Sequence, residues 1–449
     1  MQKLRFLIAQ LLVLVAVFCF APTAWAFCGF YVSKADAKLY NKASQIVIAH
    51  SGERTVVTMA NDYQGEVKDF ALVVPVPSVL QKDQVHVAEP KIVERLDAFS
   101  APRLIEYFDS NPCEPVPPPM PLSAPAGVIM QDSARSSRST GVTVEARFNV
   151  GEYDIVILSA KESGGLETWL NRNGYKIPRG AKQLLKPYIR SSMKFFVAKV
   201  NLDKFEQSGY QYLRPLQISY SSSKFMLPIR LGMINSTAEQ DLIVYALSPK
   251  GQTEVTNYRT VKVASDANIP LFVKDEFANF YKSMFQTAYT REDKKVAFLE
   301  YAWDMSSCDP CSADPLTSAE LKQAGVFWLG DDNSTSPGVS PPSNNVFITR
   351  LHVRYTRNKF PEDLMFQETS NQESFQGRYI LQHPYAGELK CKAGSQYKRS
   401  LSGRFDQEAQ TLAKLTNWDI QQIREKMKLT VNQFKTSWWQ NFVNRLGFS

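Results

Sequence analysis

The sequence predicts an α+β protein with largely antiparallel β-sheets, helical inserts and a helical C-terminal region. Short runs of β-branched and aromatic residues recur along most of the chain, and aromatic residues make up 12% of it, which favours strands and well-filled cores. Stretches with apolar residues three and four positions apart lie between these runs and again near the C-terminus. Hydrophobic residues at 44% and charged residues at 21% are ordinary values for a folded globular protein.

The first 26 residues have the pattern of a removable signal peptide. Lys3 and Arg5 precede the apolar stretch 6–20, and residues 24–26 (Ala-Trp-Ala) form a small-x-small cleavage site. The apolar stretch is shorter than the roughly 20 residues that a membrane-spanning helix needs. An uncleaved anchor is the alternative interpretation. We therefore expect an exported protein, periplasmic or extracellular after signal peptide cleavage, with no transmembrane span in the mature chain.

The N-terminal β-rich part is expected to span residues 27–111. The runs 44–48 and 55–59 are β-prone and flank a Ser-Gly-Glu-Arg turn, which predicts a hairpin. A third strand at 70–74 is followed by Pro-Val-Pro, which suits a strand end or an edge. Residues 90–109 are predicted to be helical, because Ile, Leu and Phe recur on one face.

Residues 112–141 form a Pro- and Ser-rich linker or loop, which begins with seven prolines between positions 112 and 125. A second β-rich part with a helical insert is expected over 142–268. The insert spans 165–190 and is interrupted by Asn-Gly and Ile-Pro pairs. The strands predicted in this part are 144–150, 153–160, 194–201, 215–220, 224–231 and 242–247.

The remaining chain is divided by the same patterns. Residues 269–330 are expected to be a helical part that contains a Cys-x-x-Cys motif, with the run 296–304 as one of its helices. A loop at 331–345 precedes a region of β strands at 346–404, with strands at 346–355 and 378–382. Residues 405–449 are expected to form basic C-terminal helices, two of which begin at capping boxes that start with Thr416 and Thr430.

Basic residues concentrate at the C-terminus. The chain has a net charge of +8, and residues 390–449 hold eleven Lys or Arg against four Asp or Glu. Such a module can attract acidic surfaces, here an anionic membrane surface or an envelope protein, whereas a solvated helix face is the alternative. Export argues against nucleic acid as the partner. The surface-binding candidates are Arg424, Lys426, Lys428, Lys435, Trp438 and Trp439.

Five cysteines remain after removal of the signal peptide. In an oxidising compartment they are expected to pair, which leaves one unpaired or bonded to another molecule. The preferred pairing joins Cys308 to Cys311 and makes one long-range bond among Cys28, Cys113 and Cys391. Spacing alone does not fix the connectivity, although a bond from Cys28 or Cys113 to Cys391 would close a very long loop.

The Cys308-Asp309-Pro310-Cys311 motif has the spacing of thiol–disulfide oxidoreductases, in which a helix start lowers the pKa of the first thiol. A helix could begin at this motif or only at Thr317. A thioredoxin-like unit places the motif soon after its first strand, whereas here it follows a run expected to be helical. A structural disulfide is therefore the first interpretation and a redox-active pair the alternative. A zinc site would require a second Cys or His pair, so no metal is expected.

No residues stand out as catalytic. The four His residues are scattered, and the chain lacks a Gly-x-Ser-x-Gly elbow, a His-Glu-x-x-His motif and a phosphate-binding Gly-rich loop. A hydrolase would require a cleft that joins a Ser or Asp to one of the histidines. We therefore expect no cofactor and a non-enzymatic binding or structural protein of the bacterial envelope, with a thiol–disulfide oxidoreductase that uses Cys308 and Cys311 as the alternative.

Several motifs occur together in an order that resembles a family of exported bacterial proteins, domain-of-unknown-function family 2330 (DUF2330). The resemblance covers roughly residues 27–325 and implies export and a shared fold. The family has no established activity, so it assigns no catalytic role. Some relatives resemble membrane-anchored forms with a C-terminal hydrophobic span, which the amphipathic C-terminus of this chain does not match. The motifs are Phe-Cys-Gly-Phe-Tyr-Val at 27–32, Asn-Asp-Tyr-Gln-Gly at 61–65, Val-Pro-Val-Pro at 74–77, Gly-Leu-Glu-Thr-Trp-Leu at 165–170, Asn-Gly-Tyr at 173–175, Pro-Ile-Arg-Leu-Gly at 228–232, Asn-Tyr-Arg-Thr at 257–260 and the Cys-x-x-Cys at 308–311.

Overall fold

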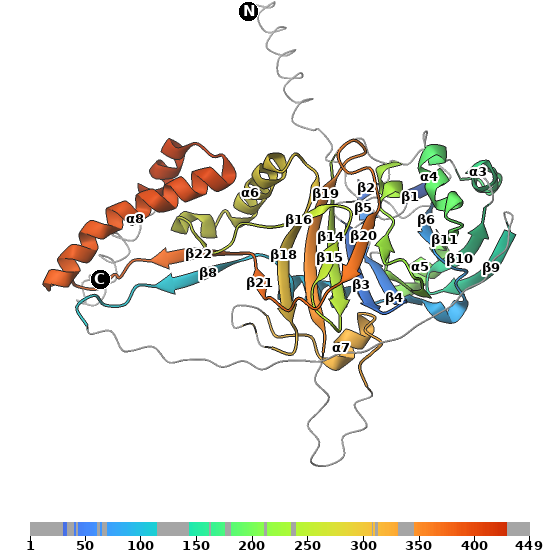
Figure 1. Cartoon of the computed structure of the whole chain (residues 1–449), viewed down its shortest axis with the longest axis horizontal. Coiled ribbons are helices and arrows are strands. Elements are labelled where there is room, and N and C mark those ends of the chain that lie inside the picture. Colours follow the sequence, from blue (N-terminus) through green and yellow to red (C-terminus); the bar gives the residue numbers. More distant parts are fainter. Residues whose placement is uncertain are drawn as a thin grey trace, which may run out of the picture.

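A computed structural model shows the predicted α+β class, with two stacked β-sheets whose outer faces carry helices (Figure 1). A smaller parallel sheet extends from this body and carries the C-terminal helix. The structure describes residues 30–33, 40–41, 44–60, 63–64, 70–114, 143–160, 163–175, 181–210, 213–234, 239–307, 309, 313–330 and 345–428.

The larger sheet has nine strands drawn from almost the whole described chain. Most neighbours are antiparallel, but β14 pairs with β3 and β16 with β18 in parallel. Its strand order is β16 (Arg259–Lys262), β18 (Val296–Asp304), β19 (Phe347–Tyr355), β14 (Gln240–Ser248), β3 (Ser44–Ser51), β4 (Arg54–Ala60), β12 (Leu216–Ser221) and β7 (Val85–Val87), with β21 (Phe375–Gln376) paired to β18.

The second sheet is antiparallel and packs its inner face on the first. Side chains of both sheets, among them Ile46, Val244 and Phe196, form the main core between them. Its outer face packs on α3 (Ser163–Arg172) and α4 (Ala181–Arg190). The strand order is β1 (Phe30–Ser33), β6 (Phe70–Val76), β11 (Lys194–Val200), β10 (Tyr153–Ser159) and β9 (Thr143–Val150).

Three helices cover the outer face of the nine-stranded sheet. Leu96 and Phe99 of α2 (Pro90–Ser100) and Leu321 of α7 (Ser318–Gln323) are buried there. Residues of α6 (Phe277–Arg291) pack on β18 beside them. This face therefore lies under helices, and polar side chains on it are removed from water.

The third region, which we call the arm, is a small parallel sheet with the C-terminal helix on it (Figure 1). Its strands are β17 (Ala267–Asn268), β22 (Arg378–His383) and β8 (Arg103–Phe108). The helix α8 (Lys392–Thr416) packs with α6, and helical residues 420–428 follow it. The remaining described elements are β2 (Tyr40–Asn41), β5 (Tyr63–Gln64), β13 (Met226–Leu227), β15 (Thr253–Val255), β20 (Leu364–Glu368), α5 (Leu202–Ser208), η1 (Lys82–Gln84), η2 (Arg230–Ile234) and η3 (Leu271–Lys274).

Several sequence predictions are confirmed. The hairpin at 44–60 is β3 and β4 in direct antiparallel register, and the helical insert is α3 and α4. The strand expected at 70–74 is β6, but it continues through Pro75 to Val76; these two residues pair with β11 and lie beyond the end of the pairing with β1, on the side where β6 has become an edge. Helix α7 begins after Thr317, which forms a capping box with Glu320.

Three element predictions are wrong. Residues 90–109 are a helix only as far as Ser100, because Pro102 disfavours helical backbone at Ala101, and the chain continues as β8. The run 296–304 is the buried strand β18 rather than a helix, an ambiguity inherent in short apolar runs. The strand expected at 224–231 is reduced to Met226–Leu227, since Pro228 follows and a 3-10 turn begins.

The C-terminal prediction also needs correction. The region of strands expected to reach residue 404 ends at His383, and α8 already begins at Lys392. Thr416 is the last residue of α8 and not a helix N-cap. The next helix is capped by Asp419, whose carboxylate accepts the Gln422 N–H at 2.9 Å. The box expected at Thr430 lies outside the described residues.

The sequence segments do not form separate sheets. The hairpin β3–β4 comes from the first β-rich part, yet it lies between β14 and β12 of the second part. Strand β6 likewise lies between β1 and β11. Both large sheets therefore combine strands from distant parts of the described chain. None of its helices combines the length and apolar character needed to cross a membrane.

Candidate functional site

Two of the predicted cysteines meet at the end of the arm. The sulfur atoms of Cys113 and Cys391 lie 2.14 Å apart and form a disulfide across a sequence separation of 278 residues. This pair is one of the long-range bonds expected from the sequence. Cys28, Cys308 and Cys311 lie outside the described residues, so the expected Cys308–Cys311 bridge stays a prediction.

The residue inside the Cys-x-x-Cys motif is anchored to the nine-stranded sheet. Asp309 is buried, and its carboxylate accepts hydrogen bonds from the Tyr301 hydroxyl at 3.0 Å and the Gln376 amide at 2.9 Å. Residues 313–317 are not helical and α7 starts at Ser318. The described residues 313–317 therefore do not supply the helix start that would lower the pKa of the first thiol, Cys308.

The predicted basic candidates divide into two groups. Arg424 pairs with Asp406 at 2.6 Å, and Lys426 pairs with Glu276 at 2.6 Å, so both cations already have an acidic partner within the protein. Lys428 is exposed. Lys435, Trp438 and Trp439 lie outside the described residues.

The structure adds four basic residues on α8 that sequence reasoning missed. Lys392, Lys398, Arg399 and Lys414 are all exposed, and their side chains form no ion pair with a described residue. Three of them, at 392, 399 and 414, follow the helical spacing of one face opposite buried Ala409 and Leu412. Their spacing along a helix could have identified this face, but residues up to 404 were predicted to be strands.

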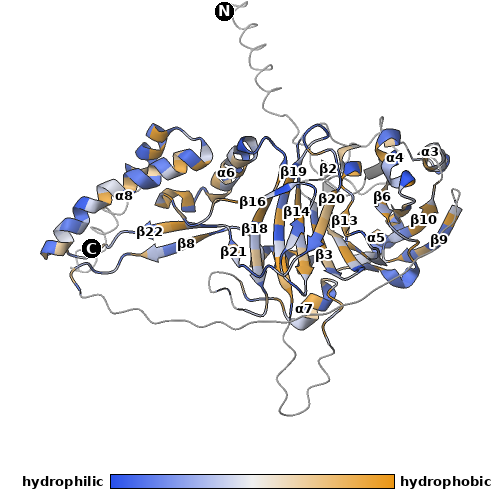
Figure 2. Cartoon of the chain, viewed as in Figure 1, coloured by the Kyte–Doolittle hydropathy of each residue, from blue (hydrophilic) through white to orange (hydrophobic). Residues whose placement is uncertain are grey.

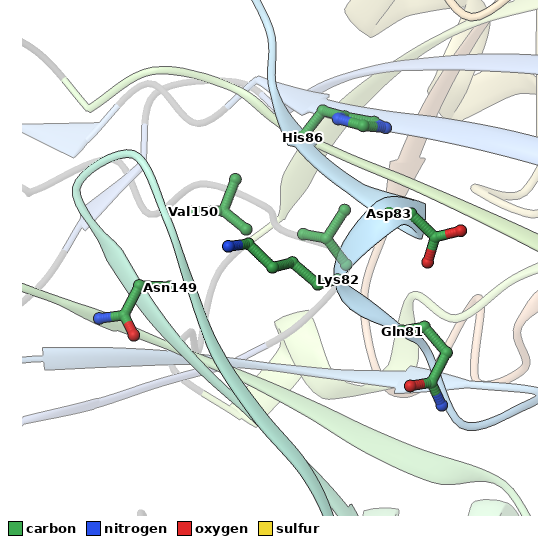
Figure 3. A pocket seen from close by; sticks show the side chains of 7 residues that line it. Gln81, Lys82, Asp83, His86, Asn149 and Val150 are labelled. Carbon is green, nitrogen blue, oxygen red and sulfur yellow. The ribbon is translucent and has the colours of Figure 1, made fainter.

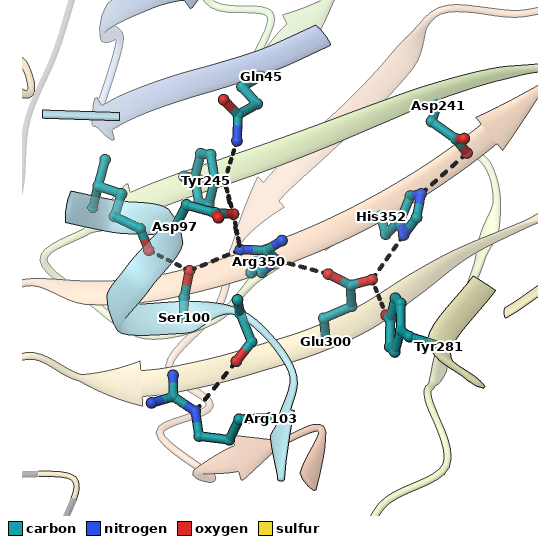
Figure 4. Close-up of polar contacts among 12 residues, drawn as sticks. Gln45, Asp97, Ser100, Arg103, Asp241, Tyr245, Tyr281, Glu300, Arg350 and His352 are labelled. Carbon is teal, nitrogen blue, oxygen red and sulfur yellow. Dashed lines mark hydrogen bonds and ion pairs between the residues drawn. The ribbon is translucent and has the colours of Figure 1, made fainter. Parts of the chain in front are cut away.

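The largest cluster of ionisable side chains is a buried network between the nine-stranded sheet and its helices (Figure 4). Strand alternation creates it: Arg350, His352 and Arg354 project from one face of β19, while Leu351 and Val353 project into the main core. Their neighbours on β14 are Asp241 and Tyr245. The acidic member on β18 is Glu300.

Glu300 lies at a β-bulge. The pairing of β18 with β19 is irregular between Leu299 and Tyr301, so Glu300 has no partner in the register. Ala297 and Leu299 belong to the main core, so strand alternation places Phe298 and Glu300 on the helix-covered face, and the bulge lets Tyr301 face the same side before Ala302 returns to the main core. The residue types around Glu300 do not predict this bulge.

His352 is held between two carboxylates. One imidazole nitrogen lies 2.7 Å from Glu300 and the other 3.1 Å from Asp241, and the ring stacks on Phe285 of α6. Burial opposes the charged imidazolium, yet the two carboxylates outweigh it and raise the pKa of His352 above its ordinary value. The folded protein therefore favours the charged form of His352 more than water does.

The carboxylates respond in the opposite direction. Burial favours protonated Glu300, but the charges of His352 and Arg350 overcome it and lower its pKa to about 2. Burial likewise opposes the ionised form of Asp241, but hydrogen bonds and charge from His352 and Arg354 hold its pKa well below the ordinary value. Both acids are therefore anions.

Arg350 connects the network to α2. Its guanidinium lies 2.6 Å from Glu300 and 2.7 Å from Asp97, and the Tyr245 hydroxyl donates to the same Asp97 oxygen at 2.7 Å. Ser100 lies 3.4 Å from the guanidinium. With His352 protonated, three anions (Asp97, Asp241 and Glu300) face three cations (Arg350, Arg354 and His352), so the network is electrically balanced and tethers the helices to the sheet.

The network ties the helices to the sheet where solvent hardly reaches. Glu300 and Arg350 are both nearly inaccessible to solvent. The residues that line the groove described below all lie elsewhere. Asp241 and His352 do satisfy the Asp–His pairing that a hydrolase requires, but within the described residues the ring nitrogens of His352 contact the carboxylates of Glu300 and Asp241 and not a hydroxyl group.

The other histidines are dispersed. His50 contacts Thr55 at 2.8 Å and stacks on Phe225, while His383 pairs with Glu106 at 2.7 Å in the arm. His86 borders an open groove of about 650 Å³ (Figure 3). Around the groove, no hydrogen bond joins the side chains of Lys82, Asp83 and His86 to one another. Its lining is Gln81, Lys82, Asp83, Val85, His86, Asn149 and Val150.

Two of the family-like motifs converge on Asp363. Its carboxylate accepts the Tyr188 hydroxyl at 2.6 Å and the Ile229 N–H at 2.9 Å, and it lies 3.3 Å from the Arg230 guanidinium. Asn257 donates to the Asp363 carbonyl at 2.7 Å. Burial raises the pKa of Asp363 despite these bonds. The motif residues at 229, 230 and 257 thus fix the loop that precedes β20.

Comparison with known proteins identifies one family. The sequence model described as "Uncharacterized protein conserved in bacteria (DUF2330)" matches residues 22–367. No curated protein and no solved structure matches the chain. The part of the chain that the structure describes contains no group of three or more His, Cys, Asp or Glu residues arranged to hold a metal ion.

Proposed function

Since this chain belongs to the DUF2330 family of uncharacterized bacterial proteins, we propose its function from its own residues: it is an exported envelope protein that binds an anionic membrane surface and catalyses no reaction. The N-terminal pattern of Lys3 and Arg5, an apolar stretch and Ala-Trp-Ala supports export. The Cys113–Cys391 disulfide supports an oxidising compartment.

The observation that carries the binding proposal is the exposed basic face of α8, formed by Lys392, Arg399 and Lys414, with exposed Lys398 on the same helix. The acidic residues of the same helix do not neutralise it, because Asp406 pairs with Arg424 and Glu408 is buried against Arg404. Figure 2 shows much of α8 in the colours of hydrophilic residues. A Lys or Arg near an anionic leaflet contributes about 1 kcal/mol of attraction, which salt screens.

The contrast with the interior supports a non-enzymatic role. The network around His352 and Glu300 uses its charges on one another and is covered by α2 and α6. The cations of α8 are instead open to solvent. The sequence beyond the described residues adds Lys435, Trp438 and Trp439, and Trp side chains favour the membrane–water interface.

The test is co-sedimentation of the mature protein with phosphatidylcholine vesicles that do or do not contain phosphatidylglycerol. We expect binding only to the anionic vesicles and loss of binding at high salt. The triple variant Lys392→Glu, Arg399→Glu and Lys414→Glu should bind at least about tenfold more weakly.

A matched control reverses three exposed cations of α4 at the other end of the molecule: Lys182→Glu, Lys186→Glu and Arg190→Glu. This control changes the net charge equally and should keep most of the binding. Equal losses in both variants, or no binding of the unaltered protein to anionic vesicles, would refute the proposed surface.

The alternative is a thiol–disulfide oxidoreductase that uses Cys308 and Cys311. The anchoring of Asp309 by Tyr301 and Gln376 supports it, because this residue of the Cys-x-x-Cys motif is held in a fixed position. An insulin-reduction assay decides: turnover that disappears in Cys308→Ser supports the enzyme, and turnover no faster than in that variant rejects it.

A further inference from the structure

The disulfide joins the family core to an extension of the chain. The family match ends at residue 367, and we call residues 368–449 the C-terminal extension. Its described part contains β21, β22, α8 and the helical residues 420–428. Cys113 belongs to the core and Cys391 to the extension, so their bond is the covalent link between the two parts besides the chain itself.

The extension covers an apolar face of the core. Ala409 and Leu412 of α8 and Ile423 of the following helix share one cluster with Phe280 and Met284 of α6. Strand β22 continues this contact as the parallel partner of β8. Polar contacts lie near the disulfide: Asp109, just after β8, pairs with Arg404 at 2.6 Å and accepts the Tyr397 hydroxyl.

The two sulfur atoms have different surroundings. Cys391 is the N-cap of the 25-residue helix α8, and its sulfur accepts the Gly394 N–H at 3.1 Å. The first turn of α8 contains no acidic residue and begins with exposed Lys392. Cys113 lies in an exposed turn. Helix N-termini and neighbouring cations stabilise a thiolate, so Cys391 is the better leaving group and Cys113 the more accessible point of attack.

We propose that Cys113–Cys391 is a thiol-exchange site at which a dithiol reductant opens the link between the family core and the C-terminal extension. A thiolate of the reductant attacks Cys113 Sγ and forms a mixed disulfide, while the Cys113–Cys391 bond breaks and its electron pair leaves on Cys391 Sγ. The second thiol of the reductant then loses its proton and displaces Cys113. The reductant ends as a disulfide, and both protein cysteines end as thiols.

This inference shares with the proposed function only the oxidising compartment, in which the bond forms. It does not depend on membrane binding. A protein that fails to bind vesicles can still undergo the exchange, and a protein that binds vesicles can prove inert to reductants. The two proposals therefore fail separately.

The first experiment measures the thiol pKa of Cys391 in the full mature protein with Cys113→Ser, from the pH dependence of iodoacetamide alkylation of the Cys391 peptide. We expect a pKa at least about one unit below the ordinary value near 8.5. Ala393→Glu, at an exposed first-turn position, should raise this pKa and slow reduction of the native bond by dithiothreitol. Ala393→Lys at the same site is the matched control and should not slow it.

The second experiment follows hydrogen exchange of α8 before and after reduction of the native protein with dithiothreitol. We expect faster exchange across residues 392–416 in the reduced protein, the same rates in Cys113→Ser/Cys391→Ser, and little change in β14. An ordinary or raised pKa for Cys391, equal reduction rates for the two Ala393 variants, or unchanged exchange in α8 would overturn the proposal.

Discussion

The buried network and the arm hold charged residues in contrasting ways. In the network, Glu300 and Arg350 are almost fully buried, lie 2.6 Å apart and are surrounded by further partners. In the arm, Arg404 and Asp109 are partly exposed, and Lys392 and Lys398 point to solvent. Helices α2 and α6 cover the network, whereas the Cys113–Cys391 disulfide joins the start of α8 to the segment after β8.

Because the two regions differ in burial, their charged residues have different roles. Removing one member of a buried pair leaves an unpaired charge away from water, which is very unfavourable. An exposed charge keeps its hydration and is available to a partner. The network therefore serves the stability of the fold, and the arm is the region where binding and chemical modification are proposed. Three substitutions test this division.

The largest effect is expected for Glu300→Gln. It leaves Arg350 and His352 without their shared buried anion and should lower the free energy of unfolding by about 3 to 5 kcal/mol. Urea denaturation followed by circular dichroism measures this change. The control Glu373→Gln removes an acid from the exposed Lys262–Glu373 pair and should cost less than about 0.5 kcal/mol. Similar losses for both would show that the network is not a special tie.

A smaller, pH-dependent effect is expected for His352→Gln. Because the folded-state pKa of His352 lies above 6.5, its contribution to stability is complete below about pH 6.5 and disappears as pH rises through the folded-state pKa. The variant should therefore lose about 1 to 3 kcal/mol at mildly acidic pH and less at alkaline pH.

The measurement for His352 is urea denaturation over a series of pH values, with exposed His86→Gln as the control. The difference between the unaltered protein and His352→Gln should shrink as pH rises. A difference that stays constant or grows with pH would mean that His352 is neutral in the folded protein.

The smallest effect is expected in the arm for Glu408→Gln. Burial on α8 raises the pKa of Glu408 to about 7 against the attraction of Arg404. Since the folded pKa exceeds the ordinary 4.5, the free energy of unfolding falls as pH rises from about 4.5 to about 7.

Replacing Glu408 with Gln removes that fall and should stabilise the protein by about 1 kcal/mol near pH 8, with little change below about pH 4.5. Thermal melting at the two pH values checks the sign. A loss of stability at pH 8 would show that Glu408 is bound to Arg404 as a stabilising anion, and that the arm resembles the network more than this comparison assumes.

Local patterns in the sequence predicted local structure well. The hairpin at 44–60 follows from two β-prone runs around a turn, and the α7 start follows from Thr317 and Glu320. The prediction failed where an apolar run fits both helix and strand, as at 296–304. Residues 392–404 failed for a different reason: they contain few apolar residues, and the surface that α8 covers comes from distant elements such as α6 and the arm's sheet.

The candidate sites were accessible from the sequence to different degrees. The excess of positive charge at the C-terminus was visible in the sequence. The sequence did not show that Arg424 and Lys426 form intramolecular ion pairs, whereas Lys392 and Arg399 are exposed without such a partner among the described residues. The network was not predicted. Arg350 is 253 positions from Asp97 and 50 positions from Glu300, and only the folded sheet with α2 on it brings the three together.

The sequence by itself determined the α+β class, the positions of the strongest turns and helix starts, the basic C-terminus and the set of cysteines that could pair. Those properties depend on residue type and on neighbours within one or two turns. Tertiary structure decided which strands share a sheet, which charges are buried and that Cys113 meets Cys391, because each of these results from contacts between residues hundreds of positions apart, whose free energy no local pattern contains.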